Sequence, residues 1–111
     1  MPLARTPEPP YWAVIFTSLR TPDDDGGYTQ TADEMEALAG QQPGYLGIES
    51  VRDTAGLGIT VSYWASEEAI LAWRRNADHL AAQRAGRDTW YRAYEIRVAR
   101  VERAYGFAKG G

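Results

Sequence analysis

The segment of residues 11–19, YWAVIFTSL, limits the possible folds more than any other part of this chain. Its β-branched and aromatic side chains favour a strand. Successive side chains of a strand point to opposite sides of its sheet. Both sets are apolar here: Tyr11, Ala13 and Ile15 on one side, and Trp12, Val14 and Phe16 on the other. A strand of this kind belongs in a sheet that is covered on both faces.

A first helix is predicted between the acidic, glycine-rich loop 23–27 and Gly40. The sequence leaves the start of this helix open. Thr31 begins a capping-box pattern, TADE, whereas the apolar spacing reaches back to Tyr28 and would place the cap near Asp25.

Two further strands, at residues 45–52 and 58–65, are joined by a short glycine-containing turn and are predicted to form an antiparallel hairpin. A second helix is predicted from the N-cap Ser66 to about residue 85, where Gly86 ends it. Its apolar stripe consists of Ile70, Trp73, Ala77 and Leu80.

The last strand is predicted within residues 90–101. Val101 is out of phase with the apolar side chains before it, which indicates a bulge near Ala99 and Arg100. The complete order predicts an α+β, ferredoxin-like βαββαβ fold, because two right-handed crossovers place both helices on one face of a four-stranded antiparallel sheet.

The chain is divided into an extended, proline-rich arm at residues 1–10, a single domain at 11–105 and a tail at 106–111. With both helices on one face, the other face of the sheet is bare although the first strand is apolar there. Burying one large apolar side chain is worth about 1.5–3 kcal/mol, so we expect this face to be covered. A homodimer through the open face of the sheet is predicted. The alternative is a single chain whose arm or tail crosses the sheet.

Composition excludes several classes of function. The net charge of −3 provides no basic surface for nucleic acid, and the absence of cysteine excludes disulfides, iron–sulfur clusters, zinc–thiolate sites and thiol catalysis. No signal peptide or membrane-spanning run is found, so a cytoplasmic protein is expected. The acidic run 23–25 lacks the ligand spacing of a calcium loop, and no metal site is predicted.

Two segments resemble a known family. Residues 42–47, QPGYLG, and residues 59–73, ITVSYWASEEAILAW, are similar to the antibiotic biosynthesis monooxygenase (ABM) domain, and the resemblance covers residues 11–105. It implies a dimeric α+β barrel. It also implies one of several activities, since the family includes cofactor-free oxidases of aromatic polyketides, quinol monooxygenases and heme-degrading enzymes.

The heme-degrading branch of that family uses an asparagine on the first strand, a tryptophan on the second helix and a histidine about three turns later. Trp73 matches the tryptophan, but Gln83 stands at the histidine position and the first strand contains no asparagine. The resemblance therefore implies no heme ligation of that kind, and no cofactor is predicted.

His79, the only histidine, is the candidate for acid–base catalysis because its ordinary pKa lies near neutrality. It shares one helix face with Asn76 and Gln83, and this polar strip flanks the apolar stripe. The strip is interpreted either as the wall of a mixed pocket, which would make Asn76 and Gln83 substrate-binding residues, or as a solvated helix flank.

Aromatic side chains supply the other candidates for substrate binding. Trp64 and Trp73 belong to the core or form a slot for a flat ligand, while Trp90 and Tyr94 add aromatic density near the loop 86–88. Arg97 is a candidate to stabilise an anion, or else part of a surface ion pair with a neighbouring acid.

Three hypotheses follow. The first is a cofactor-independent monooxygenase acting on a small, flat, phenol- or quinol-type substrate, with His79 and Arg97 as catalytic residues. The second is a non-catalytic ligand-binding or stress-associated dimer on the same scaffold. The third is a heme-binding or heme-degrading protein with altered ligands.

Overall fold

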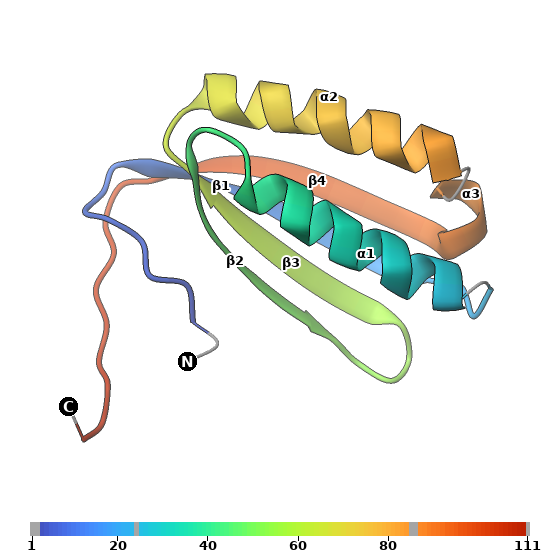
Figure 1. The fold of residues 1–111 in the computed structure, drawn as a ribbon. Coiled ribbons are helices and arrows are strands. Elements are labelled where there is room, and N and C mark those ends of the chain that lie inside the picture. Colours follow the sequence, from blue (N-terminus) through green and yellow to red (C-terminus); the bar gives the residue numbers. More distant parts are fainter. Residues whose placement is uncertain (1–2, 24, 85–86, 111) are drawn as a thin grey trace.

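The computed structural model describes residues 3–23, 25–84 and 87–110 (Figure 1). The elements are β1 (Tyr11–Arg20), α1 (Asp25–Gly40), β2 (Tyr45–Arg52), β3 (Leu57–Trp64), α2 (Glu67–Arg84), α3 (Arg87–Trp90) and β4 (Tyr91–Val101). Apart from the one-turn helix α3, which the sequence did not predict, this is the expected βαββαβ order, and the predicted ferredoxin-like fold is confirmed.

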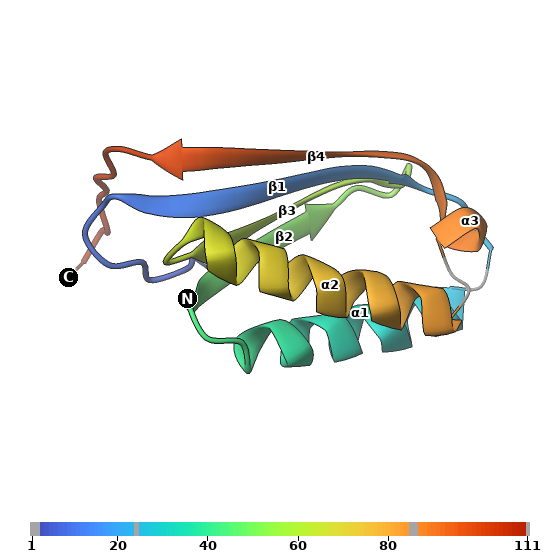
Figure 2. The same cartoon turned by 90° about the horizontal axis from the view of Figure 1, so that it is seen from above.

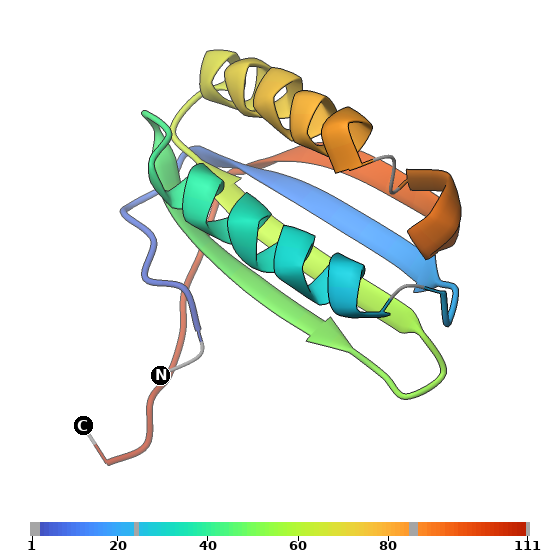
Figure 3. The same cartoon turned by 45° about the vertical axis from the view of Figure 1, so that its right-hand side comes forward.

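The four strands form one antiparallel sheet in the order β2-β3-β1-β4, so β1 lies inside the sheet with a neighbour on each side. Val14 of β1, for example, faces Ser62 on one side and Val98 on the other. Both helices lie on the same face of this sheet and run in opposite directions (Figures 2 and 3). The two ends of the chain leave from one end of the sheet (Figure 1).

The start of α1 agrees with the apolar spacing and not with the capping box. The helix begins at Asp25, and Thr31 is buried inside it, so the capping-box alternative is wrong. The reason is that Tyr28 packs against Trp90 and Tyr91, which makes the first turn of the helix part of the interior. The predicted end of the second helix, at Ala85 and Gly86, lies outside the described residues.

The bulge predicted near Ala99 and Arg100 is also wrong. The pairing of β4 with β1 is regular there, and the irregularity lies at the other end of the ladder, next to Arg20. Val101 is out of phase because it belongs to the face of the sheet away from the helices, where it pairs with Tyr11. That face also carries apolar side chains, such as Tyr11 and Ile15 of β1. Val101 can therefore be apolar and point to that face in a regular strand, without a bulge.

The core lies where both helices meet the sheet near the start of α2. Trp64 is completely buried there with Ala39 of α1 and Ile70 of α2, and Trp12, Tyr45 and Trp73 pack around this cluster. The indole N–H of Trp64 donates to the Ser62 hydroxyl at 2.9 Å, which satisfies its polar atom inside the core.

Gly44 allows the loop before β2 to pack closely against the start of α2. Its φ of +85° is a conformation that favours glycine, and a Cβ atom there would lie 2.7 Å from Cβ of Ala69. Its carbonyl accepts a hydrogen bond from the Ala65 amide at 2.8 Å. The loop therefore holds the start of α2 against the sheet.

Gly44→Ala should lower the free energy of unfolding by about 1–2 kcal/mol from the backbone conformation alone, with a further loss from the contact with Ala69. The matched control is Gly40→Ala, since a Cβ at Gly40 would meet nothing within 4 Å. Urea denaturation of the two variants measures the difference. Equal stability of both variants would contradict this account of the loop.

Candidate functional site

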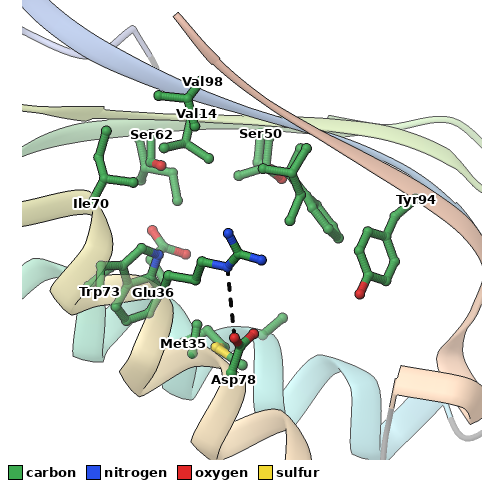
Figure 4. A pocket seen from close by; sticks show the side chains of 18 of the residues that line it. Val14, Met35, Glu36, Ser50, Ser62, Ile70, Trp73, Asp78, Tyr94 and Val98 are labelled. Atoms are coloured by element: carbon green, nitrogen blue, oxygen red, sulfur yellow. Dashed lines mark hydrogen bonds and ion pairs between the residues drawn. The ribbon is translucent and has the colours of Figure 1, made fainter. Parts of the chain in front are cut away.

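A cavity of about 450 Å³ lies between the two helices and the sheet. The helix-facing side chains of the strands form one wall, and α1 and α2 form the other (Figure 4). The cavity exists because the helices do not cover β4. Ile96 and Val98 face the helices from β4, yet they are 48% and 50% exposed. A volume of this size suits a small organic ligand.

Aromatic rings close the cavity at both ends. At the core end the ring of Trp73 is stacked on that of Trp64, with centroids 6.0 Å apart. At the other end Phe16 contacts Tyr91 and Tyr94, with centroids 5.5 and 5.3 Å away. Aliphatic side chains such as Met35 and Ile48 lie between the two ends. A flat apolar molecule would therefore meet ring faces and edges at each end.

Charged groups line the helix side of the cavity. Glu36, Glu67 and Asp78 contribute carboxylates, and Arg74 is 3.9 Å from Asp78 in an exposed ion pair (Figure 4). The sheet side is polar but uncharged in the middle, where the hydroxyls of Ser50 and Thr60 are 2.6 Å apart.

The end of the cavity near the start of β4 is polar as well as aromatic. Tyr28 and Tyr91 line it, and behind them lie the guanidinium groups of Arg20 and Arg52. These four residues are called the tyrosine–arginine end below. Arg52 donates to the Tyr28 hydroxyl at 3.2 Å, and Arg20 lies 3.8 Å from the centroid of the Tyr28 ring.

Hydrogen bonds fix both arginines. Arg20 is buried and donates to the Trp90 carbonyl at 2.7 Å and to Asp25 at 2.8 Å. Arg52 donates to the Ser18 hydroxyl at 2.7 Å and to the Gly56 carbonyl. Burial, and then the proximity of Tyr28 and a hydrogen bond to its hydroxyl, raise the pKa of Tyr91.

Among the residues predicted to bind substrate, Trp73 and Tyr94 line the cavity. Trp64 lies behind Trp73 in the core, and Trp90 is buried with its ring edge-on to Tyr28. These two tryptophans support the walls but are not part of the lining.

The polar strip of α2 lies elsewhere. Asn76, His79 and Gln83 are all exposed, and none of them is among the lining residues. The Asn76 amide donates to the Gln42 side chain at 3.1 Å, which joins α2 to the loop after α1. This placement corresponds to the solvated-flank alternative in the single chain.

Arg97 lies on the opposite face of the sheet from the cavity. It pairs with Ile15 of β1, whereas Tyr94 and Ile96 point to the helices. The structure therefore does not bring Arg97 together with the rings that line the cavity.

The tyrosine–arginine end was missed from sequence, although a signal for it exists. Arg20 is in phase with Phe16 on β1, and Arg52 is in phase with Ile48 on β2, so the alternation places both arginines on the helix-facing side. Tyr28 is the first member of the apolar series of α1. Combining the phase of the two strands with the earlier helix start would have brought these residues together.

The face of the sheet away from the helices is partly covered by the N-terminal arm. The Ala4 amide donates to Glu49 at 3.0 Å, and the Thr6 hydroxyl donates to Tyr11 at 3.0 Å. Beyond the arm the face remains open, since Val51 is 72% exposed and Ile59 is 42% exposed.

Comparison with known families identifies this architecture. Residues 13–85 match the antibiotic biosynthesis monooxygenase (ABM) family. The chain belongs to this family. The resemblance predicted from sequence is thus confirmed.

Three relatives illustrate the range of the similarity. The uncharacterized protein YqjZ of Bacillus subtilis is 54% identical over 101 residues, 91% of this chain and 88% of YqjZ. A jasmonate monooxygenase of Pyricularia oryzae is 30% identical over 94 residues, 81% of this chain but 43% of that protein. SnoaB, a cofactor-independent oxygenase from Streptomyces nogalater, shares the fold at 10% identity, with a TM-score of 0.66 over 86% of this chain and 97% of SnoaB.

Within residues 3–23, 25–84 and 87–110, no three His, Cys, Asp or Glu side chains gather as they would around a metal ion. In the same part of the chain, each helix is too short or too polar to cross a membrane.

The stability of the fold should depend on pH through Tyr63, which lies next to the N-terminal arm. The Tyr63 hydroxyl donates to the Glu49 carboxylate, which also accepts a hydrogen bond from the Ala4 amide. Burial, and then the bond to Glu49, raise the pKa of Tyr63 from 10.0 to about 12. A raised pKa means that the folded chain holds this proton more tightly than the unfolded chain. The stabilisation is complete below pH 10 and is lost as the pH rises to about 12.

The free energy of unfolding of the parent protein should therefore fall when the pH is raised from about 8 to about 11. In Tyr63→Phe, which lacks this hydroxyl, the fall should be smaller. Urea denaturation at both pH values measures this loss. Tyr105→Phe is the matched control, because Tyr105 is 99% exposed. Identical losses in the parent and in Tyr63→Phe would contradict the raised pKa of Tyr63 in the folded chain.

Proposed function

We propose that this protein is a cofactor-independent monooxygenase that binds a flat, phenol- or quinol-type aromatic molecule in the cavity. The observation that carries the proposal is the ring-lined cavity itself, with Trp73 at one end and Phe16 and Tyr94 at the other. Membership of the ABM family supports the reaction class, as do the activities for which the Pyricularia relative and SnoaB are named.

The proposed reaction uses molecular oxygen as the oxidant. An anthrone-type methylene group and O₂ give a carbonyl group and water, so one oxygen atom enters the ring system and the other leaves as water. A quinol and O₂ give a hydroxyquinone and water by the same balance. The substrate anion supplies the electrons, and the protein has to hold the rings, accept a proton and stabilise the anion.

Glu36 is the proton acceptor that we propose. Its carboxylate lines the cavity and is exposed, so a proton taken from the substrate can pass to water (Figure 4). A role for His79 or Arg97 would require contact with a substrate outside this cavity, since neither lines it.

Oxygen uptake with a panel of quinols and anthrones tests the proposal. We expect the parent protein to consume O₂ with at least one of them and Ala77→Phe to be slower by about tenfold or more, because the new ring fills the cavity. Ala82→Phe is the control on the same helix, since Ala82 is exposed and outside the lining. Absence of uptake, with a ligand recovered unchanged, would favour the non-catalytic binding protein instead.

The same assay separates the two sets of residues. Glu36→Gln should lower turnover by about 100-fold if Glu36 is the base. The double variant His79→Ala, Arg97→Ala should leave turnover within about twofold of the parent. The opposite pattern would restore His79 and Arg97 as catalytic residues and remove Glu36.

We also propose that two copies pair through the open face of the sheet. The arm covers one end of this face, and the exposed Val51, Leu57 and Ile59 at the other end are apolar. Apolar area of this kind is unfavourable in water, and a two-fold pairing of identical faces covers it in both copies.

Sedimentation at micromolar concentration should give twice the mass of one chain. Ile59→Lys should give the mass of one chain, because a lysine would be buried without a partner at the interface. Ala82→Lys, on the exposed side of α2, should keep the dimer. A parent protein that sediments as one chain would rule out the pairing.

A further inference from the structure

We infer that the tyrosine–arginine end of the cavity is an anion subsite that holds an ionised oxygen of the aromatic ligand. This inference rests on the proposed binding of such a ligand in the cavity, and it adds the orientation of the ligand and the residues that select it.

The hydroxyl of Tyr28 is arranged as a donor toward the cavity. Its oxygen accepts a hydrogen bond from Arg52 at 3.2 Å, and its ring is held against the guanidinium group of Arg20. Since the oxygen already accepts from Arg52, the hydroxyl proton is available for another acceptor. Tyr28 lines the cavity, so a ligand oxygen can be that acceptor.

Tyr91 adds a second phenol at the same place. Its ring lies 5.9 Å from that of Tyr28 at an angle of 84°, and it also lines the cavity. Its hydroxyl is hydrogen-bonded to that of Tyr28, and this bond is one of the causes that raise the pKa of Tyr91. Because Tyr91 is bonded to Tyr28, the pair offers one hydroxyl proton to a ligand, and a single donor with guanidinium groups behind it suits a negative oxygen.

The charges around the cavity direct an anion to this end. On the helix side, the three carboxylates of Glu36, Glu67 and Asp78 outnumber the single guanidinium of Arg74 and would repel it. At the tyrosine–arginine end, Arg52 forms no ion pair with a carboxylate of the described residues, and its partners are neutral oxygens. A half-buried cation without a counter-ion favours an anion nearby.

The subsite also fits the proposed chemistry. Removing a proton from a conjugated ring system spreads the negative charge to an oxygen at the far side of the rings. Glu36 lies two helical turns from Tyr28 along α1, near the other end of the cavity. Proton removal at the Glu36 end would then leave the anionic oxygen at Tyr28 and Tyr91.

The test uses 4-nitro-1-naphthol, a flat two-ring phenol whose ionised form absorbs visible light. Bound to the parent protein, its acid dissociation constant should rise by about tenfold, the effect of one hydrogen bond to a charged oxygen. Tyr28→Phe keeps the ring on Arg20 and should return the constant to within about twofold of the free value. Arg52→Gln should have the same effect, and Tyr105→Phe should keep the full shift.

Quenching of tryptophan fluorescence measures binding of the same probe independently, because Trp73 lines the cavity. Quenching without a shift in ionisation would overturn the anion subsite and leave the cavity proposal standing. Absence of quenching would overturn both. A shift that survives in Tyr28→Phe would overturn the subsite even if Arg52→Gln does not fold.

Discussion

The packing of Trp64 is the constraint on which the rest of the structure depends. This fully buried ring is stacked on Trp73 of α2 and lies against Ala39 of α1, so it fastens both helices to the sheet at one end. Farther along, the helices leave Ile96 and Val98 in the middle of β4 uncovered, and the space between them and this part of the strand remains open. A tight core at one end and an uncovered strand at the other together produce the cavity.

The two phases of β1 divide its side chains between the two faces of the sheet. Val14 and Phe16 face the helices and line the cavity, while Ile15 faces the open side of the sheet. A strand that is apolar in both phases therefore contributes to both the proposed ligand site and the proposed contact surface. The placement of Arg97 follows from this division, because its phase assigns it to the open side.

The fold was predictable because it depends on patterns that a single sequence carries. Strand alternation, the glycine turns and the apolar stripe of α2 gave the element order and the strand bounds to within a residue or two. The site was less predictable because it depends on distances between elements. Trp73 and Tyr94, which were predicted from their chemistry, line the cavity. Arg52 and Tyr28 are 24 positions apart and meet only when β2 and α1 pack together. His79 drew attention as the only histidine, but chemistry alone cannot tell an exposed helix flank from a cavity wall.

The arginines at the end of the cavity contribute to the stability of the fold and belong to the proposed anion subsite. Removing a guanidinium group from water is costly unless its donors find acceptors. Arg20 meets this cost with the Trp90 carbonyl and Asp25, and Arg52 with Ser18, Gly56 and Tyr28. These bonds join β1, β2, α1 and the start of β4 where the Trp64 core does not reach. The two guanidinium groups that join these elements therefore also place positive charge behind the phenols of Tyr28 and Tyr91 at the wall of the cavity.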